Sequence, residues 1–191
     1  MHIVSLLFFA ILVISAQGSI GPNSSGRTTR SERTIADCQK WYNVEPDPAP
    51  LLAKIRKCPC SIPTSFPKEY NDGGAKWKTD DGCQAAQQPN TCSYHKGAHG
   101  CYRHAYGSSG PGTQCCYNKA GIWISDPFQG AGTLDRECAP TNILNIFQWL
   151  AHNKHDVIPW DDCCKDPAMP REICQLYYEK RPPGECVNYS F

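Results

Sequence analysis

Cysteine is the residue type with the most chemistry to offer in this sequence, because 13 of the 191 residues carry a thiol. Thiols bind zinc, act as nucleophiles or are oxidised to disulfides. The usual zinc-binding C-x₂₋₄-C spacing is absent from the close pairs, so we expect each member to form a disulfide with a distant partner, and the pairs to join at least six remote positions into one compact unit. The pairs are Cys58 with Cys60, Cys115 with Cys116, and Cys163 with Cys164.

Two pairs of histidines could also do chemistry, His95 with His99 and His152 with His155. Gly97 and the polar, turn-like residues around it argue against a helix that would point His95 and His99 at one metal ion, so we expect loop histidines. His152 and His155 lie near the expected end of a helix. Solvated imidazoles would complement the helix dipole there.

His155 and Asp156, followed by Cys163–Cys164, resemble the His–Asp pair and cysteine doublet that share one helix in secreted phospholipase A2. The order is reversed here, and we expect Pro159 to interrupt any shared helix. The sequence also lacks a glycine-rich calcium loop of that type, a nucleophile elbow and an H-E-x-x-H motif. We therefore predict no catalytic, cofactor-binding or metal-binding residues and no cofactor. A small secreted enzyme of the hydrolase type stays as an alternative.

The first residues predict secretion. Ile3–Ile14 is an almost unbroken apolar run, too short to span a bilayer, and small residues follow it up to Gly18. Residues 1–18 are therefore expected to be a cleaved signal peptide, which leaves a secreted, extracellular mature chain without a membrane span. Residues 19–36 are largely polar and are predicted to be a flexible linker.

Two kinds of sequence signal predict processing of the mature chain. Asn23 and Asn188 begin N-x-S sequons and are candidate glycosylation sites. The linker also contains Arg27-Thr28-Thr29-Arg30 and Arg30-Ser31-Glu32-Arg33, which fit a minimal R-x-x-R convertase pattern. A solvated linker that is not cleaved is the favoured alternative.

The composition narrows the class of protein. With 19 Lys and Arg against 18 Asp and Glu, the net charge is +1, so there is no surplus to neutralise nucleic acid and no nucleic-acid partner is expected. Between Pro67 and Gly121 there is no Ile, Leu, Val, Met or Phe, yet the segment holds five cysteines and several aromatic residues. Cross-links and aromatic rings must therefore order this part of the chain.

Periodicity and turn residues predict a small disulfide-rich α+β fold, with short helices packed with β-hairpins. Helices are expected at Pro50–Lys57, at Thr141–Asn153, capped by its first residue, and at Pro170–Lys180. A hairpin is expected from Gln114 to Ser125, with its turn at Asn118–Gly121.

An ordered series of short motifs runs from Cys38 to the C-terminus: Cys38-Gln39-Lys40-Trp41, Cys58-Pro59-Cys60, Cys92-Ser93-Tyr94-His95-Lys96-Gly97-Ala98, Cys101-Tyr102-Arg103, Gln114-Cys115-Cys116-Tyr117, Gly132-Thr133-Leu134-Asp135-Arg136, Cys163-Cys164 and Arg181-Pro182-Pro183. This combination resembles the AMOP domain, an adhesion-associated domain of membrane mucins, sushi-domain-containing membrane proteins and isthmins. Residues 37–191 are therefore identified as an AMOP-like cysteine-rich domain. The resemblance implies an extracellular module in adhesion or signalling, with no established catalytic residues to carry over.

Cys138 lies outside these motifs. Because 13 is odd, we expect Cys138 to be left over, either as a thiol or as a bond to a second chain in a disulfide-linked dimer. The other twelve cysteines are expected to form six disulfides, whose connectivity the sequence does not give: Cys38, Cys58, Cys60, Cys83, Cys92, Cys101, Cys115, Cys116, Cys163, Cys164, Cys174 and Cys186.

The function that we expect is a secreted, non-catalytic binding or adhesion module with an unknown extracellular protein or cell-surface partner. A diffusible isthmin-like signalling antagonist is a further alternative. Because the scarce aliphatic residues are needed inside, a binding surface would come from polar and aromatic loops. The competing interpretation is that these aromatic residues replace the missing aliphatic core. The candidate loop residues are Tyr94, His95, His99, Tyr102, Arg103 and His104.

Overall fold

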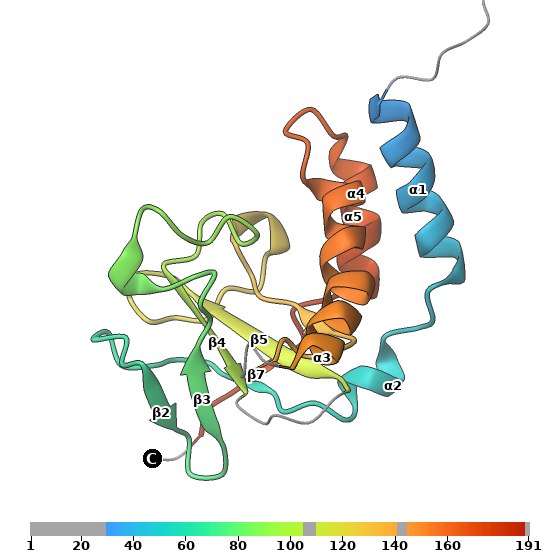
Figure 1. The fold of residues 1–191 in the computed structure, drawn as a ribbon. Coiled ribbons are helices and arrows are strands. Elements are labelled where there is room, and N and C mark those ends of the chain that lie inside the picture. The colour runs from blue at the N-terminus through green and yellow to red at the C-terminus, as the bar shows by residue number, and fades with distance from the viewer. Residues whose placement is uncertain (1–29, 105–109, 141–144, 190–191) are drawn as a thin grey trace, which may run out of the picture.

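The computed structural model describes residues 30–104, 110–140 and 145–189, which form a layer of strands beside a layer of helices (Figure 1). The helices are α1 (Arg30–Val44), α2 (Ala49–Leu52), α3 (Ile146–His152), α4 (Ile158–Cys164) and α5 (Arg171–Lys180). The strands are β1 (Cys58–Pro59), β2 (Glu69–Asn71), β3 (Lys76–Thr79), β4 (Gly100–His104), β5 (Gly112–Tyr117), β6 (Leu134–Asp135) and β7 (Cys186–Val187). Shorter helical segments are η1 (Ala85–Gln87), η2 (Pro127–Gln129) and the π-helical η3 (Asn153–Val157). The predicted α+β class is confirmed.

Five strands form an antiparallel sheet in the order β2-β3-β4-β5-β6, and β1 pairs with β7 in parallel. In the β4–β5 register, Tyr102 lies opposite Cys115 and Cys101 lies opposite Cys116. Because successive side chains alternate between the faces of a strand, these two pairs lie on opposite faces of the sheet.

Aromatic rings and disulfides fill the core of the sheet in place of aliphatic side chains. On one face, Trp77, Tyr102 and Tyr117 are fully buried and pack together with the disulfide of Cys115. On the other face, the disulfides of Cys83 with Cys92 and of Cys101 with Cys116 are buried beside Ala98. The prediction that cross-links and rings order this segment is confirmed.

Six disulfides connect the described parts of the chain. Cys58 bonds Cys115 with 5.7 Å between their Cα atoms, so two of the close pairs are joined to each other. The expectation that the three pairs reach at least six separate remote positions is therefore wrong, because β1 lies against β5. The bridges are Cys38–Cys163, Cys58–Cys115, Cys60–Cys186, Cys83–Cys92, Cys101–Cys116 and Cys164–Cys174.

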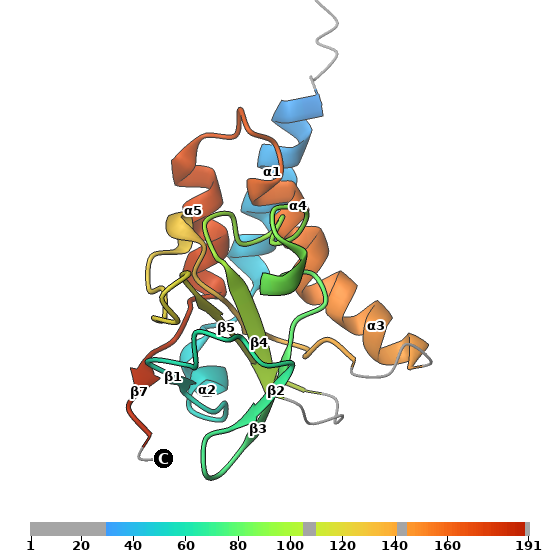
Figure 2. The ribbon, with the colours of Figure 1, turned by 90° about the vertical axis from the view of Figure 1, so that its left-hand side faces the viewer.

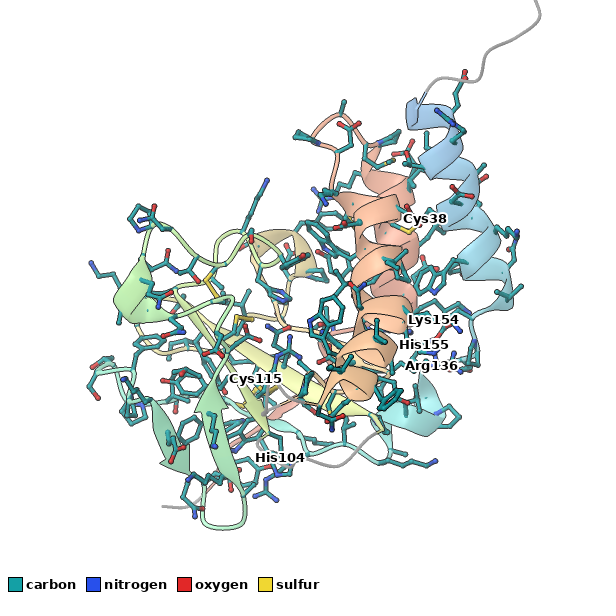
Figure 3. All side chains as sticks on the ribbon, viewed as in Figure 1. Cys38, His104, Cys115, Arg136, Lys154 and His155 are labelled. Atoms are coloured by element: carbon teal, nitrogen blue, oxygen red, sulfur yellow. A yellow bond between two sulfur atoms is a disulfide. The ribbon has the colours of Figure 1, made fainter. Side chains whose placement is uncertain are left out.

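Helices α1, α4 and α5 pack against one another around a second core. Cys38 of α1, labelled in Figure 3, bonds Cys163 of α4, and Trp41 stacks on Tyr177 of α5 with 5.7 Å between ring centroids. Since α1 begins at Arg30, residues 30–36 of the predicted linker are helical. The reason is that Ile35 continues the stripe of Cys38 and Trp41 at three-residue spacing, which gives this segment a face to bury.

Helical backbone continues from Ile146 to Cys164 through η3. The prediction that Pro159 interrupts the helix is therefore wrong. Proline has no N–H to donate to the carbonyl four residues earlier, which here is His155 O. The Arg181 guanidinium supplies the missing donor, with Nη2 2.8 Å from His155 O. A π-helical turn and a side chain from outside the helix therefore accommodate the proline.

The other predicted elements differ mainly in length. Helix α3 is capped by Asn145, whose side-chain oxygen accepts from Gln148 N at 3.2 Å, and not by Thr141, which lies outside the described residues. The helix predicted at residues 50–57 is the shorter α2, and the second arm of the hairpin makes isolated bridges, of Trp123 with Tyr117 and of Ile122 with Ser61. Helix α5 confirms the prediction at residues 170–180. In the described parts of the chain, no helix has the length and apolar character needed to cross a membrane.

Candidate functional site

The arginines and the aspartate of the family motifs are buried or half-buried, and they join the helical layer to the sheet. Arg181 follows α5 and is 1% exposed; its Nη2 donates to Glu45 Oε1 at 2.8 Å and its Nε donates to Asp156 Oδ1 at 2.7 Å. Arg136 binds both carboxylate oxygens of Glu45, at 2.9 and 3.0 Å. Two arginines and two carboxylates therefore fasten α1, η3, α5 and the segment after β6 to one another.

Asp156 is the centre of this helical-layer network. Its oxygens also accept from the backbone N–H groups of Arg136 and Glu137, at 2.9 and 3.1 Å, and lie 3.3 Å from His152 Nδ1. Burial on its own would raise the pKa of Asp156, but His152 and Arg181 hold it below its ordinary value. These partners satisfy the hydrogen-bonding capacity of the buried carboxylate, whose role is to hold the surrounding segments together.

His152 is largely buried, so the expectation of a solvated imidazole there is wrong. Its Nδ1 lies 2.7 Å from Glu137 O. Burial alone would lower the pKa of His152, but the hydrogen bond to Asp156 and the charge of Asp135 raise it. The physical reason for the error is that the helix continues to Cys164, so His152 does not lie at a helix end.

A second buried network lies on the sheet. Arg103 of β4 bridges the carboxylates of Asp80 and Asp135, and Gln114 Nε2 donates to Asp80 Oδ2 at 2.9 Å. Desolvation would raise the pKa of Asp80, yet the Arg103 charge keeps it lowered. Asp135 belongs to this network and its neighbour Arg136 to the helical one. The Gly132–Arg136 motif therefore couples the two layers.

The predicted binding loop is mostly interior. Tyr102 is fully buried and donates its hydroxyl to Pro67 O at 2.8 Å; His95 is buried with Nδ1 2.7 Å from Ala131 O. Arg103 is held between two carboxylates. The hypothesis that these three side chains form a ligand surface is wrong, because the aromatic residues and their polar partners replace the missing aliphatic core.

The other loop residues also pack onto aromatic rings. Tyr94 is 40% exposed and lies edge-on to Trp160, His99 lies edge-on to Phe66, and His104 of β4 lies edge-on to Trp77. Figure 3 labels His104 at the sheet end of the molecule. Among the described residues, no His, Cys, Asp and Glu side chains gather in a group that could hold a metal ion.

The candidate modification sites lie on different parts of the chain. Asn188 is exposed just after β7, whereas Asn23 lies outside the described residues. Arg33, at the end of the second convertase pattern, is exposed on α1. Cys138 is half-buried, and Gln148 Nε2 lies 3.1 Å from its Sγ. Burial raises the pKa of the Cys138 thiol, which opposes its ionisation.

Helix α3 carries the surface feature that the sequence prediction missed. Four large apolar side chains of this helix are exposed to solvent: Ile146 (61%), Phe147 (87%), Trp149 (52%) and Leu150 (50%). Figure 2 shows α3 projecting away from the sheet and from α1. Large apolar side chains therefore lie on the surface here, although aliphatic residues are scarce in the rest of the chain. We call these four residues the α3 apolar face.

The side of the helix that faces the molecule is polar. Gln148 is buried with Nε2 3.1 Å from Cys138 O, while His152 and Asp156 join the helical-layer network. These three residues are spaced at i, i+4 and i+8, which places them on one helix face. Ordinary amphipathicity is therefore inverted, and this polar stripe was the sequence signal that could have located the exposed face.

The molecule also contains a shallow hollow of about 460 Å³ beside the Cys83–Cys92 disulfide. Residues 88–93 and 96–98 line it, with Lys96 as the ionisable side chain in the lining. The lining residues include no acid–base pair, so the hollow does not have the groups of a catalytic site.

Comparisons with known proteins agree with the motif resemblance. The family model of the AMOP domain matches residues 33–190. Protein mesh of Bombyx mori is 30% identical to this chain over 163 residues, which cover 80% of this chain and 10% of that protein. The chain thus spans about a tenth of the length of this curated relative. No solved structure matches the chain.

Proposed function

Because the chain belongs to the AMOP domain family, we propose that it is a secreted, non-catalytic extracellular binding module of the adhesion type. The observation that carries the proposal is the α3 apolar face. Contiguous exposed apolar side chains on a protein mark an interaction surface, because leaving them in water costs free energy that a partner would recover.

The covalent structure supports the extracellular part of the proposal. Six disulfides persist in an oxidising compartment and are rare in reducing ones. They close loops as long as those between Cys38 and Cys163 and between Cys60 and Cys186. The apolar run at residues 3–14, with its small-residue cleavage region, supports secretion as the route.

The use of the buried ionisable groups supports the non-catalytic part. Catalysis by acid and base needs groups that face a substrate, with pKa values near the working pH. Here Asp156, Glu45, Asp80 and Asp135 each accept from arginine side chains inside the molecule. Their charges stabilise the contact between layers and do not face an open cleft.

Expression of the full chain in a secreting cell line tests the proposal. We expect protein with six disulfides in the medium, and saturable binding of that protein to intact cells. The double variant Phe147→Ser/Leu150→Ser should lose at least tenfold in cell binding. The matched control is Val44→Ser, because Val44 is 77% exposed at the end of α1.

Three results would overturn the proposal: retention of the natively folded chain inside the cell, absence of binding to intact cells, or equal loss of binding for the control and the double variant. Disulfide mapping of each secreted variant separates a loss of contact from a loss of folding.

A further inference from the structure

The α3 apolar face is a compact group of exposed side chains at a projecting end of the molecule. Its four side chains cover about half of the helix circumference at ideal helical spacing, and the helix projects from the molecule (Figure 2). They offer on the order of 400 Å² of exposed apolar area. A stable dimer needs about 800 Å² per partner, so a second copy of the chain would cover this face poorly.

A cation lies behind the apolar tip on the same side of the helix. Lys154 is exposed and follows Phe147 by seven residues, which is two turns and about 10 Å along an ideal helix axis. His155 and Arg136 are close enough to influence each other's charge, and Figure 3 shows both near Lys154. Interfacial segments insert their apolar side chains by about 5–10 Å, which leaves Lys154 at the level of the lipid phosphates.

The acidic side chains that act on His155, Glu45 and Asp156, are buried. The sequence has no Asp or Glu between Glu137 and Asp156. Glu137 accepts from Gly110 N at 2.8 Å, and Asp156 is 3% exposed within the helical-layer network. An apolar tip with a cation behind it, and with the neighbouring carboxylates buried or hydrogen-bonded, complements an anionic lipid surface.

We propose that the α3 apolar face docks on a lipid bilayer, with Ile146, Phe147, Trp149 and Leu150 inserted among the acyl chains and Lys154 at the headgroups. The inference rests on the proposed function, since it names what the extracellular module contacts on a cell. The presence of Trp149 in this face agrees with the enrichment of tryptophan near membrane surfaces. Leaving four such side chains in water is the cost that insertion removes.

Flotation of the purified, disulfide-bonded chain with unilamellar vesicles tests the inference. We expect it to float with phosphatidylcholine vesicles, and addition of phosphatidylserine to raise the affinity about fivefold. Phe147→Ser/Leu150→Ser should lower the affinity at least tenfold, while Val44→Ser should leave it unchanged. Lys154→Gln should remove the gain from phosphatidylserine.

Two outcomes would overturn the inference: wild-type protein that does not float with either vesicle, or a double variant that floats as wild type does. Equal binding to both vesicle compositions would overturn the role of Lys154. If the chain binds cells but not vesicles, and protease treatment of the cells abolishes that binding, the partner is a protein; the inference then fails while the proposed function stands. Absence of binding to both cells and vesicles would overturn both.

Discussion

The segment Tyr94–His104 and helix α3 are buried and exposed in the opposite way to what their compositions would predict. The segment is polar and aromatic, yet His95 and Tyr102 are buried in it. Helix α3 is rich in large apolar residues, yet Phe147 is 87% exposed. Burial in this molecule therefore follows hydrogen-bond partners and cross-links more closely than hydrophobicity.

The physical basis of this exchange is that the polar interior is paired. Burying a polar group costs free energy only where its hydrogen-bonding capacity is left unmet. Arg103 forms ion pairs with Asp80 and Asp135 on the sheet, and Arg181 forms an ion pair with Asp156 among the helices. Each disulfide adds about 2–4 kcal/mol, mainly by restricting the unfolded chain. The apolar residues of α3 are therefore not needed for the core.

The largest effect should come from removing the aromatic core of the segment. We expect Tyr102→Ala to lower the free energy of unfolding by about 4 kcal/mol, because a fully buried ring and its hydroxyl bond to Pro67 O are lost. Tyr94→Ala, on the exposed side of the same segment, should cost about 1 kcal/mol. Urea unfolding of the secreted proteins with their disulfides intact measures both. Equal losses would show that the two tyrosines do not differ in burial.

The helical-layer network should give the next largest effect. Arg181→Met leaves Glu45 and Asp156 buried without their shared cation and exposes the unmet carbonyl of His155, so we expect a loss of about 3 kcal/mol. Lys119→Met, at an exposed turn, is the matched control. If the two variants unfold at the same urea concentration, the network contributes nothing measurable to stability.

The sequence predicts the use of cysteines and aromatic rings, but not which of them face inward. A scarcity of aliphatic residues between Pro67 and Gly121 is enough to predict a cross-linked aromatic core. Tyr94 and Tyr102 cannot be distinguished from composition, because burial of Tyr102 depends on the register of β4 against β5. Helix α5 was predictable from its own periodicity, whereas η3 depends on Arg181, 26 residues beyond His155 in the chain.

The pH dependence of stability should identify His152 as part of the network. The pKa of His152 is raised in the folded state, so its contribution is fully present below the unfolded-state pKa of about 6.5 and is lost as pH rises through the folded value. We therefore expect His152→Gln to destabilise the protein more at about pH 5.5 than at about pH 8. Asp156, whose pKa is lowered, stays ionised over this range.

Unfolding titrations of wild type and His152→Gln at both pH values measure this difference directly. His95 provides a contrasting control, because burial lowers its pKa and its effect has the opposite sign: the neutral buried form loses stability as pH falls. A His152→Gln penalty that is the same at both pH values would show that the imidazole contributes only by its shape.

The smallest effect on stability should come from α3. This result would separate the exposed apolar helix most clearly from the buried polar segment Tyr94–His104. Phe147→Ser/Leu150→Ser removes two exposed side chains, so we expect the free energy of unfolding to change by less than about 1 kcal/mol, mostly from helix propensity. The same variant should elute earlier from a hydrophobic-interaction column, whereas Tyr102→Phe should elute with wild type. A stability loss comparable with that of Tyr102→Ala would place the α3 side chains in the core, because only buried groups carry penalties of that size. Unchanged stability with earlier elution would assign the core to the polar segment and the contact surface to the apolar helix.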